Sequence, residues 1–162
     1  MSNKIIIRTI LIILILINCI TIFCFSAQGA EKSSNSSGRV VNTIIEKNPR
    51  TKNLSKAEKE KVKEKITKPI RKLAHFSIYT CLGLLLFSLF QTFDEITSKR
   101  KFAYSWGLGM FYACTDEIHQ KFVGGRSSEI TDVLIDSMGV LFGIFISFMV
   151  CKHIIKILKN KV

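Results

Sequence analysis

The sequence predicts an all-α fold: an integral membrane bundle of about four transmembrane helices, with an amphipathic, basic connection between the first two. Hydrophobic residues make up 48% of the 162 residues, and there are only two prolines. The apolar residues gather in long runs, and basic residues flank these runs. A chain of this length and composition has room for one membrane domain, so we expect residues 1–162 to form a single domain.

The charge balance indicates a membrane surface as the main partner. The formal net charge is +12, from 24 Lys and Arg against 12 Asp and Glu. Such an excess is typical either of nucleic-acid binding or of contact with anionic lipids. No nucleic-acid-binding motif accompanies the charge, and basic residues border the apolar runs. We therefore expect anionic membrane lipids, and no nucleic acid, as partners.

The first predicted span covers residues 5–25, which are mostly Ile, Leu and Phe. At about 1.5 Å per residue, this run is long enough to cross a hydrocarbon core of roughly 30 Å. Its basic start and the small residues at 27–30 are also typical of a cleaved signal peptide. The apolar run is longer than a typical signal core, so we favour a retained helix.

A polar connection spans residues 26–72. Its serines at 33–37 indicate a flexible start. After them, four apolar residues recur at helical spacing: Val40, Val41, Ile44 and Ile45. This pattern predicts a short amphipathic helix, which Asn48-Pro49 should end.

A second helix of the connection should begin at Ser55, because Ser55 and Glu58 have the spacing of a capping box. This helix is rich in lysine and is expected to bend near Pro69, where the chain enters the membrane. Attraction to an anionic surface would hold it flat on the lipid. A solvated charged helix explains the same residues equally well.

The remaining spans are predicted at residues 73–93, 102–120 and 130–150. The third apolar run alone is too short to cross a membrane, so its helix must continue through the polar residues that follow it. Gly139 and Gly143 in the last span form a Gly-x-x-x-Gly pair, which allows two helix backbones to approach closely.

The second span begins with polar side chains on one helix face. Arg71, His75 and Tyr79 are each four residues apart, so they stack along that face. Ionisable residues at membrane depth are expensive and indicate a functional site that faces the bundle interior. We expect these three residues to contribute to binding.

The third span ends with two carboxylates, an imidazole and an amide. Asp116, His119 and Gln120 share one side of the helix by their three- and four-residue spacing, whereas Glu117 is turned about 100° away. One acid is thus expected to face the bundle while the other orients a partner or meets solvent. All four residues are candidates for the site.

The other candidates lie at neighbouring span ends. Asp132 and Asp136 are one turn apart in the last span, and Arg126 is the obvious counter-ion for one of these acids. Ser26 and Gln28 follow the first span directly. Four spans place all these groups at one membrane face, which predicts a shared site. The positive-inside rule favours that face as the outer one, with both termini inside.

These motifs together resemble the VanZ-like family of small bacterial membrane proteins. The matching segments are Phe25-Ser26-x-Gln28, Arg71-Lys72-x-Ala74-His75-Phe76-x-x-Tyr79, Asp116-Glu117-x-His119-Gln120-x-Phe122-x-x-Gly125-Arg126 and Asp132-Val133-Leu134-x-Asp136-x-x-Gly139. The resemblance implies a multi-pass protein of the bacterial cell membrane. The founding member of the family is associated with reduced susceptibility to the glycopeptide teicoplanin. Two positions depart from the usual family pattern: Gly124 replaces a common Pro, and Asp136 replaces a common Asn.

Two functions remain open at this point. In the first, the protein binds a lipid head group, a cell-wall precursor or a glycopeptide, and the polar residues form the pocket. In the second, it is a membrane-embedded enzyme acting on a lipid or lipid-linked phosphate, with His119, Asp116, Glu117 and His75 as candidate catalytic residues. His119 would then be the general base, Asp116 or Asp132 would orient it, and Arg126 would hold phosphate.

We favour the binding function, because no nucleophile with an adjacent base is evident in the sequence. No metal site or cofactor is expected. The sequence contains no recognised metal spacing such as His-Glu-x-x-His, and its five cysteines include no Cys-x-x-Cys pair. An oligomer is compatible with the sequence.

Overall fold

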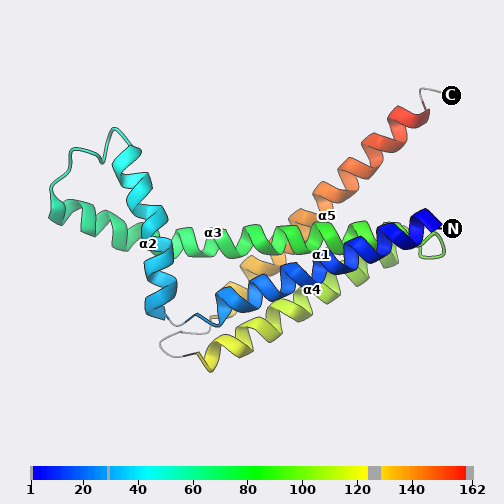
Figure 1. Ribbon diagram of the computed structural model, residues 1–162, viewed down its shortest axis with the longest axis horizontal. Coiled ribbons are helices and arrows are strands. Elements are labelled where there is room, and N and C mark those ends of the chain that lie inside the picture. The colour runs from blue at the N-terminus through cyan, green and yellow to red at the C-terminus, as the bar shows by residue number, and fades with distance from the viewer. Residues whose placement is uncertain (1, 29, 124–128, 160–162) are drawn as a thin grey trace.

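The computed structural model describes residues 2–28, 30–123 and 129–159. Five helices occupy these ranges, and no strand occurs within them. The helices are α1 (Ser2–Ser26), α2 (Ala30–Lys47), α3 (Lys56–Gln91), α4 (Ser98–Lys121) and α5 (Ile130–Lys159) (Figure 1). The predicted all-α class is therefore confirmed.

Three of the described helices are long and apolar enough to cross a membrane. They are α1, α3 and α5, within the segments Asn3–Ser26, Lys56–Gln91 and Ile130–His153. Helix α4 has 24 residues, a sufficient length, but it is less apolar because charged residues lie at both of its ends. It packs against α3 and α5 in the same bundle. The predicted number of about four spans is thus approximate: α1, α3 and α5 account for three of them, and α4 would be the fourth.

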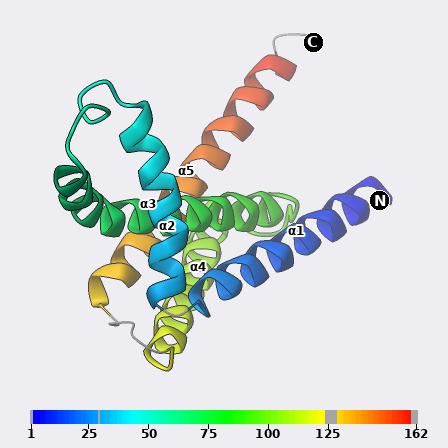
Figure 2. The same ribbon diagram turned by 60° about the vertical axis from the view of Figure 1, so that its left-hand side comes forward.

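Helices α3 and α5 touch along their backbones. A Cβ atom on Gly143 would overlap the carbonyl oxygen of Thr80, and one on Gly83 would overlap the carbonyl oxygen of Val140. A Cβ atom on Gly139 would lie 2.6 Å from the carbonyl oxygen of Phe76. The close approach predicted from the Gly-x-x-x-Gly pair is therefore confirmed. Both views show α5 crossing α3 (Figures 1 and 2).

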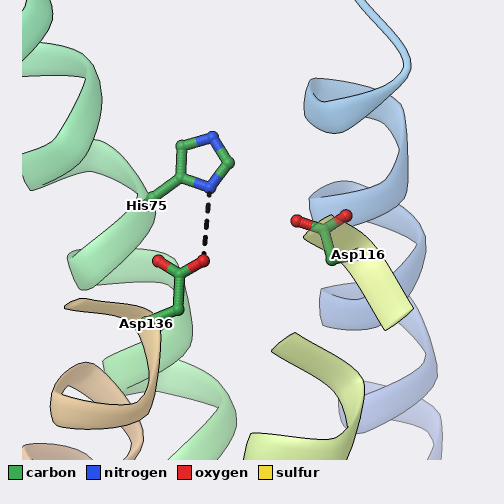
Figure 3. A group of neighbouring side chains, drawn as sticks. All are labelled: His75, Asp116 and Asp136. Carbon is green, nitrogen blue, oxygen red and sulfur yellow. Dashed lines mark ion pairs between the residues drawn. The ribbon is translucent and has the colours of Figure 1, made fainter. Parts of the chain in front are cut away.

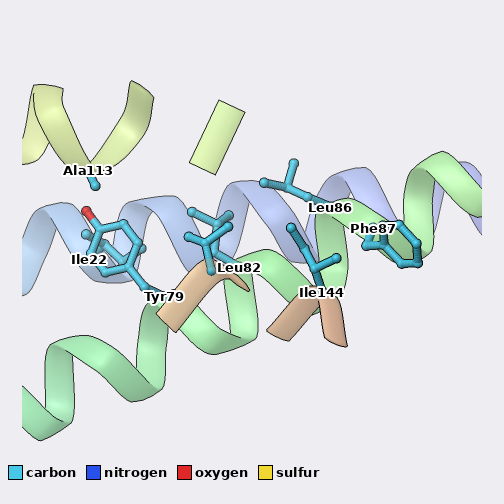
Figure 4. Close-up of a cluster of buried hydrophobic side chains, with 8 residues drawn as sticks. Ile22, Tyr79, Leu82, Leu86, Phe87, Ala113 and Ile144 are labelled. Atoms are coloured by element: carbon cyan, nitrogen blue, oxygen red, sulfur yellow. The ribbon is translucent and has the colours of Figure 1, made fainter. Parts of the chain in front are cut away.

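The apolar core draws on all four long helices (Figure 4). Its buried members are Ile22 from α1, Tyr79, Leu82, Leu86 and Phe87 from α3, Ala113 from α4, and Val140 and Ile144 from α5. Helix α1 is therefore part of the packed bundle, even though most of its other side chains are exposed on the outer surface.

Helix α2 begins earlier than the sequence predicted. The serine-rich residues 33–37, interpreted as flexible, belong to the helix, so that prediction is wrong. Val41 and Ile45, one turn apart, are buried where α2 packs on α3. Burial of this apolar stripe outweighs the weak helix preference of serine. The helix ends at Lys47, just before Asn48-Pro49, as predicted.

Helix α3 combines two segments that the sequence analysis had separated. Its predicted capping box is confirmed: the Ser55 hydroxyl accepts from the Glu58 amide at 3.3 Å, and the Glu58 carboxylate accepts from the Ser55 amide at 2.9 Å. The helix then runs through Pro69 to Gln91 without ending. Its 36 residues correspond to about 54 Å, more than the roughly 30 Å of a hydrocarbon core. The first part of α3 must therefore lie outside the hydrocarbon.

Candidate functional site

Buried polar side chains from four helices meet at one end of the bundle. Ser26 comes from α1, Asp116 and Gln120 from α4, and Asp136 from α5, and each is at most 6% exposed. His75 and Tyr79 reach the same place from α3, with Tyr79 completely buried. The structure thus brings together side chains that the sequence analysis had placed at one membrane face. We call these six residues the polar cluster.

Asp116 is held by two donors from different helices. The Ser26 hydroxyl donates to its Oδ2 at 2.8 Å, and the Gln120 amide donates to the same oxygen at 3.0 Å. Gln120 Nε2 also lies 3.4 Å from Ser26 Oγ. Hydrogen bonds to an ionised carboxylate are stronger than neutral ones, so this triangle fixes the end of α1 against α4.

His75 faces a second buried acid. Its Nδ1 lies 3.9 Å from Asp136 Oδ2, and the Asp136 side chain is only 4% exposed. Figure 3 shows His75, Asp116 and Asp136 pointing toward one another from α3, α4 and α5. Tyr79 lies one turn further along α3, and its hydroxyl points toward α4 beside Ala113 (Figure 4). The shared face predicted for His75 and Tyr79 therefore lines the cluster.

Ion pairs close the rim of the cluster. Lys72 Nζ lies 3.2 Å from Glu129 Oε2 and also pairs with Asp132. Lys68 Nζ lies 3.7 Å from the other Glu129 oxygen. Asp132 was predicted as a site residue from the sequence, whereas Lys72 and Glu129 were not. Lys72 is next to the predicted site residue Arg71, and Glu129 directly precedes α5. These positions were the available signal, but spacing along the sequence could not show that α3 and the start of α5 meet.

Glu117 of α4 contacts the residue that precedes α5. It is 5% exposed, and its Oε1 accepts a hydrogen bond of 2.8 Å from the Glu129 backbone amide. This contact satisfies an amide that precedes the first turn of α5. Asp116 and Glu117 thus point to different partners, as the 100° rotation between neighbouring residues requires.

Among the described residues, no ion pair or hydrogen bond joins His119 to Asp116 or Asp132, the acids that were expected to orient it. The His119 ring stacks on Phe23 of α1, with ring centroids 4.7 Å apart and an interplanar angle of 26°. Its buried Nε2 has no hydrogen-bond partner among the described residues. Within those residues the imidazole beside a carboxylate is that of His75, so the geometry favours His75 over His119 as an acid–base group.

Arg71 lines a pocket, a groove and a much smaller hollow of about 10 Å³, and His75 of the cluster also lines the pocket and the small hollow. The pocket, of about 210 Å³ between α1, α2 and α3, has mainly apolar walls, and its polar groups are Gln28, Ser37, Arg71 and His75. An open groove of about 890 Å³ between α2 and α3 is charged instead. Its basic residues are Arg39, Lys63, Lys68 and Arg71, and its acids are Glu60 and Glu64. The predicted binding residues Gln28 and Arg71 thus line the pocket, which reaches the cluster at His75, and Arg71 also lines the groove.

A family model described as VanZ/LLP1 matches residues 10–152, nearly the whole chain and all of the polar cluster. The chain belongs to the VanZ/LLP1 family. No curated protein and no solved structure matches it. Together with three helices able to cross a bilayer, the family match makes this VanZ/LLP1 protein a membrane protein.

One part of the family motif lies outside the described residues. Gly124, Gly125 and Arg126 fall within residues 124–128. The expected pairing of Arg126 with an acid therefore stays a prediction. Asp136, which replaces a common Asn of the VanZ-like pattern, lies within the cluster beside His75.

The stability of this VanZ/LLP1 protein should decrease in acid, because Glu129 loses its charge and with it the ion pair to Lys72. A hydrogen bond and the nearby charge of Lys72 hold the pKa of Glu129 below its ordinary value of 4.5. Because the folded pKa is depressed, the stabilisation is complete above pH 4.5 and is lost as the pH falls through the lowered pKa. Thermal unfolding of the purified protein, measured from neutral pH downward, should show this loss.

The Glu129→Gln variant should lack this acid-dependent component. Glu95→Gln, at an exposed acid between α3 and α4, is the matched control and should retain it. An identical pH dependence in the wild type and Glu129→Gln would contradict the assignment.

Proposed function

We propose that this VanZ-like membrane protein acts in the bacterial cell envelope, where it binds a phosphate-bearing amphiphile and lowers susceptibility to glycopeptides such as teicoplanin. The observation that carries the proposal is the position of Arg71, which lines both the apolar pocket and the basic groove. A single ligand with an apolar chain and an anionic head could occupy both hollows at once.

The chemistry of the two hollows supports this class of ligand. Six of the ten residues that line the pocket are large apolar or alanine side chains of α1, α2 and α3, which suit an acyl or isoprenyl chain: Ile22, Phe25, Val40, Ile70, Ala74 and Ile78. Arg71 is half-buried, and a guanidinium in that position can bind phosphate in a bidentate manner. Lys63 and Lys68 of the groove add positive charge that attracts anionic head groups. A membrane lipid and a lipid-linked cell-wall precursor share this chemistry.

If the protein binds a phosphate-bearing amphiphile of the envelope, less of that molecule is accessible to a glycopeptide at the cell surface. This mechanism requires binding alone. It also agrees with the cluster geometry, in which Ser26 and Gln120 both donate to Asp116 and so serve to fix the helices beneath the pocket.

The alternative is a membrane-embedded enzyme acting on a lipid or lipid-linked phosphate. The observation in its favour is the position of His75 beside two buried carboxylates, an arrangement suited to proton transfer. In that case His75 would be the acid–base group, and turnover of a lipid-linked phosphate by purified protein would reveal it. The described residues include no nucleophile hydrogen-bonded to His75, so we favour binding.

The test is the glycopeptide susceptibility of a bacterial host expressing the wild type or the Arg71→Gln variant. Wild type should raise the teicoplanin concentration needed to stop growth several-fold, and Arg71→Gln should lose most of this effect at equal membrane abundance. Lys65→Gln is the matched control, because it removes the same charge from an exposed position of α3 that lines neither hollow.

A second variant tests the apolar pocket without changing charge. Ala74→Phe should fill part of the 210 Å³ and weaken the effect in the same way. No tolerance in a host with abundant wild-type protein would contradict the proposal, as would full tolerance in both Arg71→Gln and Ala74→Phe.

A further inference from the structure

We propose that His75, Asp116 and Asp136 bind one divalent transition-metal cation, of the Zn²⁺ or Mn²⁺ class, at the centre of the polar cluster. Neither the family match nor the proposed binding of an amphiphile requires this site. It follows from the donor atoms, the charge and the unpartnered groups that the fold brings together.

The donor atoms already surround a common centre. One imidazole nitrogen and one oxygen from each carboxylate all lie within 4.8 Å of one another. Two ligand atoms at about 2.1 Å from a tetrahedral ion are separated by about 3.4 Å. Small side-chain rotations would close the remaining difference. The three ligands come from three helices, α3, α4 and α5, so the site exists only in the assembled bundle (Figure 3).

The charge of the site favours a cation. Asp116 and Asp136 are 5% and 3% exposed, and two buried carboxylates at membrane depth repel each other. The described lysine beside them, Lys72, pairs with Glu129 and Asp132 instead. A divalent ion would neutralise both carboxylates at the point where they face the imidazole.

An unpartnered buried atom gives the second observation. Asp136 is only 3% exposed, and its buried Oδ1 accepts no hydrogen bond from the described residues. The fully buried Tyr79 hydroxyl lies beside the Asp116 carboxylate and adds a further polar group next to the ligand set. Buried polar atoms are nearly always satisfied, so such a group beside a metal-ligand set indicates an unseen partner.

The surroundings of the ligands resemble the outer shell of a metal site. Ser26 and Gln120 both donate to Asp116 Oδ2, which fixes the orientation of that carboxylate. Tyr79 follows His75 by one turn, where its hydroxyl could donate to a water or carboxylate bound to the ion. These supporting groups come from α1, α3 and α4.

The donor set selects the class of metal. Mg²⁺ and Ca²⁺ prefer oxygen ligands throughout, whereas an imidazole nitrogen favours zinc, iron, nickel and, together with carboxylates, manganese. Three protein ligands would leave at least one coordination position open for water or another oxygen donor.

Metal titration of the purified full-length protein tests the site. The protein would be treated with a chelator, returned to metal-free buffer in lipid nanodiscs, and titrated calorimetrically with Zn²⁺ or Mn²⁺ alone. We expect about one tight site per chain, with dissociation constants at least about tenfold weaker for His75→Gln and Asp136→Asn. The metal should also raise the unfolding temperature of wild type but not of these variants.

A histidine elsewhere supplies the matched control. His153 is exposed on α5 beyond the core contacts, so His153→Gln should bind metal as wild type does. Far-ultraviolet circular dichroism would establish that each variant is folded, and Asp116→Asn replaces any variant that is not. Absence of saturable binding by folded wild type would overturn the proposal, as would equal binding by wild type and every folded ligand variant. Because the titration uses metal alone, its outcome is separate from glycopeptide tolerance.

Discussion

The Gly143→Ala variant is expected to lose the contact between α3 and α5 and to fold poorly or not at all. Its new Cβ atom would overlap the carbonyl oxygen of Thr80 and lie 2.7 Å from the backbone nitrogen of Leu84. Both atoms belong to the α3 backbone, so no side-chain rotation can relieve the overlap. The helices must move apart, which should reduce the free energy of unfolding by about 3 kcal/mol or more.

Gly107→Ala is the matched control for this substitution. A Cβ atom on Gly107 of α4 would meet nothing within 4 Å, and alanine is favoured over glycine in a helix by about 1 kcal/mol. Membrane abundance and the thermal unfolding of purified protein would measure both variants. A Gly143→Ala protein as stable as Gly107→Ala would show that the backbones of α3 and α5 are not in contact.

Removal of the Asp116 carboxylate should have the second-largest effect. Asp116→Ala leaves the buried Ser26 hydroxyl and Gln120 amide without their shared acceptor. Each buried group left unsatisfied costs about 1–3 kcal/mol, so destabilisation of roughly 2–6 kcal/mol is expected. Asp116→Asn keeps the shape and one acceptor oxygen and should lose about 1 kcal/mol or somewhat more.

The Asp116→Asn variant also distinguishes a binding function from an enzymatic one. If the protein works by binding, glycopeptide tolerance in Asp116→Asn should fall only as far as its folding or ligand affinity falls. An enzyme would give a folded Asp116→Asn protein without activity. Asp94→Ala, at an exposed acid that pairs with Lys4, is the control and should unfold close to wild type. Equal stability of Asp116→Ala and Asp94→Ala would contradict the contacts of Asp116.

Local signals in the sequence predicted the fold well. The spacing of Ser55 and Glu58 predicted a capping box, and the spacing of Gly139 and Gly143 predicted a helix contact, because each depends on residues within one or two turns. The continuity of α3 through Pro69 was not predictable in this way. A proline removes one helical hydrogen bond, and packing of the flanking turns decides whether the helix survives.

The partners within the site depended on how each helix is rotated about its axis. At about 100° per residue, Gln120 lies about 40° from Asp116, whereas His119 lies about 60° away in the opposite direction. A three- or four-residue spacing therefore groups these residues loosely. Only the packed bundle turns Asp116 and Gln120 toward Ser26 and leaves His119 against Phe23. The pairing of Lys72 with Glu129 likewise depends on tertiary structure.

The backbone contact between α3 and α5 has a consequence for motion. Two helices joined through Gly83, Gly139 and Gly143 move as one body, because no side chain lies between them to rearrange. Helix α1 has no such contact, and its other end is anchored where Arg8 donates to the Thr92 hydroxyl and carbonyl at 3.0 and 2.7 Å. At the Ser26 end, side-chain hydrogen bonds to Asp116 and Gln120 hold α1, so any displacement of α1 that admits a molecule to the interior must break these hydrogen bonds rather than separate two helix backbones.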